Sequence, residues 1–253
     1  MVASYFTSRR NLLESQLAVS PEDKTIREGG MMFANQSALV NELDALVAKW
    51  HLLKHPFYQA WTAGTLDRNH LQLYAAQYYQ HVRAFPDHLR ALADRCEDGL
   101  RPLVEDNLAE EDFPGRTHPQ LWREFAAAVG VGDAELDSAA PLPGTQALVD
   151  TFGRLSREGT AAEAVAAFYV YEAQVPEIAT QKINGLRRFY GVNGTRGLAY
   201  FAVHEEADIR HRAAWRGWLT QQPVEVKDGA VRAAGDALRA LWGALDAVSP
   251  ACP

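Results

Sequence analysis

Apolar side chains recur at three- and four-residue intervals along most of this chain, and this periodicity favours a helical fold. The first such run holds Leu43, Leu46, Val47, Trp50 and Leu53, and a longer one extends from Leu71 to Leu92. Spacing of this kind places apolar residues on one face of an α-helix. No alternating pattern typical of a strand extends beyond a few residues. The sequence therefore predicts one all-α domain of roughly seven helices.

Helix-breaking residues give the expected boundaries. Pro86 lies inside the long run and is expected to kink it rather than end it. The next helix should end near Glu111, because Pro114 and Gly115 follow. Residues 130–145 are rich in Gly, Pro and Asp and are expected to form a connecting loop. Further helical runs cover 165–186 and 201–218, and a last helix is expected over about 225–248.

Length, composition and charge exclude several classes of protein. The chain has 253 residues, of which 47% are hydrophobic and 23% charged, a balance typical of globular proteins. Its net charge of −7 disfavours binding to nucleic acid or to an acidic membrane surface, and no stretch approaches the ~18 apolar residues of a membrane span. Its two cysteines form neither a disulfide framework nor a CxxC site. We therefore expect a cytoplasmic protein. Residues 1–33 are polar and are interpreted as a loosely attached extension of a single domain over 34–253.

The strongest chemical signal is His204-x3-Asp208-x2-His211. Spacings of four and three place these three side chains on one face of a helix. Phe201 precedes them and Trp215 follows them in the same register, so the three polar residues occupy the buried stripe. Glu172 breaks an apolar stripe in the same way, and a lone buried carboxylate needs either a cation or a proton.

Six residues together form a candidate metal site. To the four above we add Glu111 and His118, which flank the Pro114-Gly115 turn. Three imidazoles and three carboxylates suit iron or manganese, with zinc as a competitor, and balance most of the charge of two divalent ions. The alternative is a set of hydrogen-bonded core residues. Glu-x-x-His, HExxH, GxGxxG, P-loop and Gly-x-Ser-x-Gly motifs are absent.

These residues and several aromatic motifs resemble the heme-oxygenase-like dimetal oxidases over roughly residues 36–220. The motifs are His55-Pro56-Phe57-Tyr58-x2-Trp61, Tyr74-Ala75-x2-Tyr78-Tyr79-x-His81-x3-Phe85-Pro86, Asn107-Leu108-x-Glu110-Glu111, His118-x3-Trp122, Tyr171-Glu172-x-Gln174-x-Pro176, Lys182 and Tyr200-Phe201-x2-His204. Within this family the chain resembles the branch around the chlamydial protein associating with death domains. The resemblance implies a seven-helix bundle shared with the TenA thiaminases and the PQQ-forming oxidase.

The resemblance also implies an activity. In this branch the six ligands hold two metal ions, Fe/Fe or Fe/Mn, that activate O2 with a reductant, and the protein makes p-aminobenzoate for folate synthesis from its own tyrosine. The tyrosine and the amine-donating lysine correspond to Tyr58 and Lys182. Lys182 lies ten residues past Glu172 at the edge of the same expected helix face, so it could reach inward. Tyr171 is a further catalytic candidate, although plain packing explains most of the other tyrosines.

Two alternatives stay open at this point. The first keeps the metal ions but oxidises an external small molecule, such as a fatty or amino acid. The second is an interaction protein that binds partner helices, which an apolar surface patch would support. We expect O2 and a small molecule as ligands, no nucleic acid and no membrane, and we leave a homodimer open.

Overall fold

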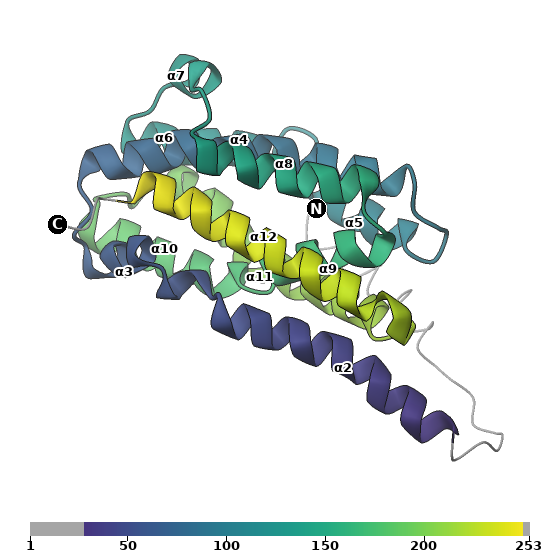
Figure 1. Ribbon diagram of the computed structural model, residues 1–253. Helices are drawn as coiled ribbons and strands as arrows, with labels where there is room; N and C mark the ends of the chain where they lie inside the picture. The colour runs from purple at the N-terminus through teal and green to yellow at the C-terminus, as the bar shows by residue number, and fades with distance from the viewer. Residues whose placement is uncertain (1–27, 250–253) are drawn as a thin grey trace. The chain divides into compact units, whose positions relative to one another are not determined.

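The computed structural model describes residues 28–249, and every regular element in that range is helical (Figure 1). Its eleven α-helices are α2 (Glu28–Lys49), α3 (Pro56–Ala63), α4 (Arg68–Ala93), α5 (Arg101–Glu111), α6 (His118–Val129), α7 (Asp133–Ser138), α8 (Pro143–Glu158), α9 (Ala161–Glu172), α10 (Val175–Phe189), α11 (Thr195–Leu219) and α12 (Lys227–Val248). Short 3-10 turns, Leu52–Lys54 and Val224–Val226, precede α3 and α12. The prediction of an all-α fold is confirmed.

The described residues from 35 to 249 form one compact unit. Within it α4 packs against α5, α6 and α8, while α11 packs against α5, α6, α9 and α10. The last helix, α12, lies along α8 and α9 (Figure 1). Large side chains fill the interior, and Trp61, Trp122 and Trp215 are almost fully buried. The helices α5, α6, α9 and α11 therefore meet in one region of the core.

Local capping chemistry fixes where two of these helices begin. Thr117 precedes α6, and its hydroxyl accepts a hydrogen bond from the Gln120 amide while the Gln120 side chain bonds back to Thr117. This reciprocal arrangement satisfies amide groups that a helix start leaves unpaired. Thr160 and Glu163 cap α9 in the same way. As a result His118 is held as the first residue of α6, immediately after the turn that follows Glu111.

The run over 165–186 is two helices, and our expectation of one continuous helix is wrong. α9 ends at Glu172, and α10 begins at Val175 with Pro176 in its first turn. Proline has no amide hydrogen and its ring clashes with the preceding turn, so a helix cannot continue through it without disruption. Gln174 stabilises the break, because its side chain donates to the Val170 carbonyl at 2.8 Å and accepts from the Leu52 amide at 2.8 Å. α4, in contrast, continues through Pro86.

The segment 130–145 also differs from the expected loop. It contains the short helix α7 and the first residues of α8. Gly130 ends α6 with a φ of 93°, a left-handed conformation that favours glycine. The expected extension over 1–33 falls mainly outside the described residues and stays a prediction. None of the helices in the described range is long and apolar enough to cross a membrane.

Candidate metal centre

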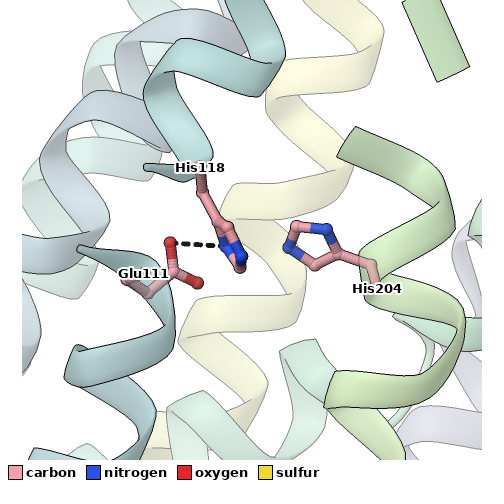
Figure 2. Close-up of side chains that lie close together, drawn as sticks. All are labelled: Glu111, His118 and His204. Carbon is pink, nitrogen blue, oxygen red and sulfur yellow. Dashed lines mark ion pairs between the residues drawn. The ribbon is translucent and has the colours of Figure 1, made fainter. Parts of the chain in front are cut away.

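Glu111, His118 and His204 form the first group of candidate ligands (Figure 2). They come from the end of α5, the start of α6 and the middle of α11. One ligand atom from each lies within 4.8 Å of the others, and all three side chains are buried. The Nδ1 atom of His118 lies 2.8 Å from a Glu111 carboxylate oxygen, and the two imidazole rings are 4.5 Å apart between their centres.

Glu172, Asp208 and His211 form the second group. Their ligand atoms also lie within 4.8 Å of one another, and all three side chains are buried. Asp208 and His211 come from α11, and Glu172 is the last residue of α9. His204 and Asp208 are four residues apart on α11, a rise of about 6 Å along the helix. The two groups are therefore neighbours, each with three candidate ligands.

Hydrogen bonds fix the orientation of two candidate ligands. Asn107 donates to one Glu172 carboxylate oxygen at 2.8 Å, and the indole N–H of Trp215 donates to the other at 2.6 Å. The Nδ1 atom of His204 lies 2.6 Å from the Tyr200 carbonyl oxygen, so Nδ1 carries the hydrogen and Nε2 has a free lone pair. Histidines that bind metals are held in this way by a partner on the second nitrogen.

Burial and neighbouring charges shift the pKa values of both groups. Burial acts to lower the pKa of His118 and of His211, but nearby carboxylates raise both, that of His211 to about 11, so a metal ion has to displace a proton at each of these imidazoles. Burial and the nearby His118 lower the pKa of His204, which favours the neutral imidazole that binds metal. Burial acts to raise the pKa of Glu111, but the neighbouring histidines lower it below its ordinary value. Burial raises the pKa of Glu172, because its ionised form lies in the core beside Asp208. An ionised Glu172 thus needs positive charge close by.

Unpartnered polar atoms provide a further test of whether metal fits here. Asp208 Oδ2 and both ring nitrogens of His211 are buried without a hydrogen bond among the described residues. Buried polar atoms normally have partners, so Asp208 Oδ2 and one nitrogen of His211 have lone pairs available for a cation. A donor set of imidazole and carboxylate suits first-row transition ions. The residues present therefore fit one metal ion in each group.

One cavity lies beside the first group. It measures about 20 Å³, which is room for about one water-sized molecule. Its walls carry Leu52, Tyr58, Tyr78, Tyr171, Val175, Ile178, Ala179, Lys182, Tyr200, Phe201 and His204. The cavity thus brings all three sequence-derived catalytic candidates, Tyr58, Lys182 and Tyr171, to the candidate ligand His204.

Lys182 is buried among aromatic rings. Its Nζ atom lies 5.4 Å from the centre of the Tyr58 ring and donates a hydrogen bond to the Tyr74 hydroxyl. The Tyr74 and Tyr58 hydroxyls are 3.3 Å apart. Burial is the one cause that shifts the pKa of this amine, and it lowers that pKa to about 7. Lys182 is buried, as expected, but it lies on α10 and not on the helix that carries Glu172. The argument that both residues share one helix face was therefore wrong.

Other tyrosines separate into two sets. Tyr78 and Tyr200 line the cavity with Tyr171, and the Tyr78 and Tyr171 hydroxyls are 2.9 Å apart. Tyr79 lies under Arg123, with 4.8 Å between the guanidinium carbon and the ring centre, and Tyr169 hydrogen-bonds to Asp44. Tyr79 and Tyr169 are therefore packing residues outside the cavity.

Sequence reasoning missed the groups that hold Glu172. Asn107 lies four residues before Glu111, and Trp215 lies four residues after His211. A four-residue interval places each of them on the same helix face as a candidate ligand. This four-residue spacing was the sequence signal that Asn107 and Trp215 lie near the candidate ligands. It does not reveal that both side chains reach across to α9.

A family model, curated proteins and solved structures all match most of this chain. The family model of an iron-containing redox enzyme matches residues 72–243. The chain is 38% identical over 224 residues to a 4-aminobenzoate synthase of Chlamydia muridarum, covering 88% of this chain and 92% of the relative. It is 37% identical over 219 residues to a 4-aminobenzoate synthase of Nitrosomonas europaea, covering 82% of this chain and 89% of the relative. A TenA homolog from Pseudomonas syringae shares the fold at a TM-score of 0.71 and 16% identity, over 84% of this chain and 91% of that one.

Proposed function

This chain belongs to the family of iron-containing redox enzymes, and we propose that it uses O2 to make 4-aminobenzoate from its own Tyr58. The similarity to 4-aminobenzoate synthases over most of both chains supports the product. The observation that carries the proposal is the shared cavity, whose walls include Tyr58, Lys182 and the candidate ligand His204. Tyrosine ring, amine and candidate metal site thus adjoin one enclosed space.

Two metal ions, either two irons or iron with manganese, would occupy the two groups. Glu111, His118 and His204 would hold one ion, and Glu172, Asp208 and His211 would hold the other. When bound, such ions supply the electrons that activate O2, and a reductant restores them. Burial of all six side chains keeps bulk water away from this chemistry.

The carbon skeleton of the product favours an internal source. The ring and Cβ of a tyrosine contain all the carbon atoms of 4-aminobenzoate. The conversion cleaves the bond between Cα and Cβ and oxidises Cβ to a carboxylate, with O2 as the oxidant. A ring C–N bond replaces the phenol C–O bond, whose oxygen leaves as water, while the Cε–Nζ bond of the donor lysine breaks and its Cε is oxidised to an aldehyde. The cavity measures about 20 Å³, room for about one water-sized molecule, and the Tyr58 ring already forms part of its wall. O2 is small enough to enter.

Lys182 is the proposed source of nitrogen. Its pKa of about 7, lowered by burial, leaves a large fraction of the amine neutral at neutral pH. A neutral amine has a lone pair and is a nucleophile, whereas an ammonium group is not. The Tyr74 hydroxyl accepts a hydrogen bond from Nζ and holds it beside the Tyr58 ring. The Tyr171 hydroxyl forms a hydrogen bond with the Tyr78 hydroxyl in the cavity wall. We assign Tyr171 the role of orienting Tyr78 in that wall.

Isotope labelling tests this function. We expect chelator-treated protein, reloaded with Fe(II) alone or with Mn(II), to release 4-aminobenzoate in O2 and reductant without any aromatic precursor. The product should carry label from ring-labelled tyrosine and from amine-labelled lysine in the chain. It should not exceed one molecule per chain, because Tyr58 is consumed.

A matched pair of tyrosine variants distinguishes the source. Tyr58→Phe should abolish the product and leave metal content unchanged, because Tyr58 is not a candidate ligand. Tyr79→Phe is the control, since Tyr79 is equally buried but lies outside the cavity. Unlabelled product, or several molecules per chain, would instead establish an oxidase that acts on an external small molecule.

A further inference from the structure

We propose that Glu110 is a positioning residue for His211, held in place by Arg210. This inference rests on the proposed metal centre, in which His211 belongs to the second group. Glu110 directly precedes the candidate ligand Glu111 at the end of α5. It lies outside both groups of converging ligand atoms.

The two nitrogens of His211 face two different carboxylates. Nδ1 lies 3.5 Å from Asp208 Oδ1, inside the second group, and Nε2 lies 3.6 Å from Glu110 Oε2. Nδ1 is therefore on the side of the candidate ligand Asp208, and Nε2 is on the side of Glu110. A histidine ligand commonly donates its second N–H to a carboxylate, which fixes the ring and strengthens its donor nitrogen. A small rotation of either side chain shortens the 3.6 Å separation to the length of a hydrogen bond.

Arg210 keeps the Glu110 carboxylate in this position. Its guanidinium donates to Glu110 Oε1 at 2.6 Å, which leaves Oε2 directed at His211. The Arg210 side chain is 53% exposed and that of Glu110 is 29% exposed. Glu110 therefore lies at the solvent-facing edge of the second group, where an unsupported histidine could turn out of the site.

Metal titration of the full-length chain, stripped with chelator, tests the role without measuring activity. Mn(II) is added under anaerobic conditions, and free Mn(II) is followed by its electron paramagnetic resonance signal. We expect two ions to bind the unaltered chain. Glu110→Ala should weaken one of them by about 10- to 100-fold and leave the other unchanged. Glu110→Gln should weaken that ion less, because its amide oxygen can still accept from His211 Nε2–H.

A matched control is another glutamate that pairs with an arginine of α11. Glu124 of α6 pairs with Arg196 of α11 at 3.0 Å, and its side chain is also 29% exposed. It contacts no candidate ligand through any bond that the structure records. Glu124→Ala should therefore bind both ions as the unaltered chain does.

Three results would overturn the inference. These are unchanged affinities in Glu110→Ala, equal weakening of both ions, and a Glu110→Gln variant as weak as Glu110→Ala. Equal weakening would indicate a general effect on folding, and failure of the glutamine to rescue would indicate a direct ligand. If the unaltered chain itself binds no metal, the proposed centre fails as well.

Discussion

The buried amine of Lys182 makes protein stability depend on pH in a way that one substitution can isolate. Lys182 is only 4% exposed, and burial lowers its pKa from the ordinary 10.5 to about 7. Between pH 10.5 and 7 the unfolded chain binds a proton at this lysine that the folded chain does not bind. Lowering the pH through this range therefore reduces the free energy of unfolding by about 1.4 kcal/mol per pH unit.

Over the whole interval between the two pKa values, the free energy of unfolding falls by about 5 kcal/mol. Below pH 7 both states carry the proton, so the effect is constant there. Lys182→Met removes the titrating group and keeps a similar volume. The variant should gain stability relative to the unaltered chain as pH falls, by about 3 kcal/mol between pH 9.5 and 7. Other titrating groups cancel in this difference.

Denaturant unfolding of chelator-treated protein at a series of pH values measures this difference. Lys49→Met serves as the control, because Lys49 is exposed at the end of α2. Its stability curve should run parallel to that of the unaltered chain. If the curve of Lys182→Met also runs parallel, the amine is charged in the folded chain. That result would refute the argument for a neutral, nucleophilic lysine.

Three further substitutions test contacts around the site. Trp215→Phe removes the indole N–H that donates to the Glu172 carboxylate. Metal titration should then show that the affinity for one ion falls by about tenfold or more. Gly185→Ala places a Cβ atom 2.5 Å from Trp61 Nε1, and thermal unfolding should show a loss of about 1–3 kcal/mol. Asp246→Ala leaves the buried Nε2–H of His55 without its acceptor, which should cost about 1–3 kcal/mol while metal content stays unchanged.

Periodicity predicted two long helices, one of which, α11, carries three of the six candidate ligands. The run from Leu71 to Leu92 is α4, and the run over 201–218 is α11. Both were recognisable because a long helix with one buried stripe repeats the same spacing several times. Polar residues within such a stripe are conspicuous, and this made His204, Asp208 and His211 candidates before any contact was known.

Contacts between helices were not predictable in the same way. The sequence did not reveal that six candidates divide into two groups of three, since the division depends on how α5, α6 and α9 meet α11. Nor did it reveal that Asn107 and Trp215 both donate to Glu172. Such pairs are set by packing across the core, whereas periodicity reports only which face of one helix is buried.

The register of α11 sets the spacing between the two groups. This helix supplies His204 to one group and Asp208 with His211 to the other, so one helical turn separates them. The break after Glu172 has a complementary effect. Because α9 stops there, Glu172 lies at a helix end opposite α11, and α10 starts anew and carries Lys182 to the cavity. In one continuous helix the directions of Glu172 and Lys182 would be fixed relative to each other. The break removes this constraint, so the carboxylate and the amine can reach different parts of the site.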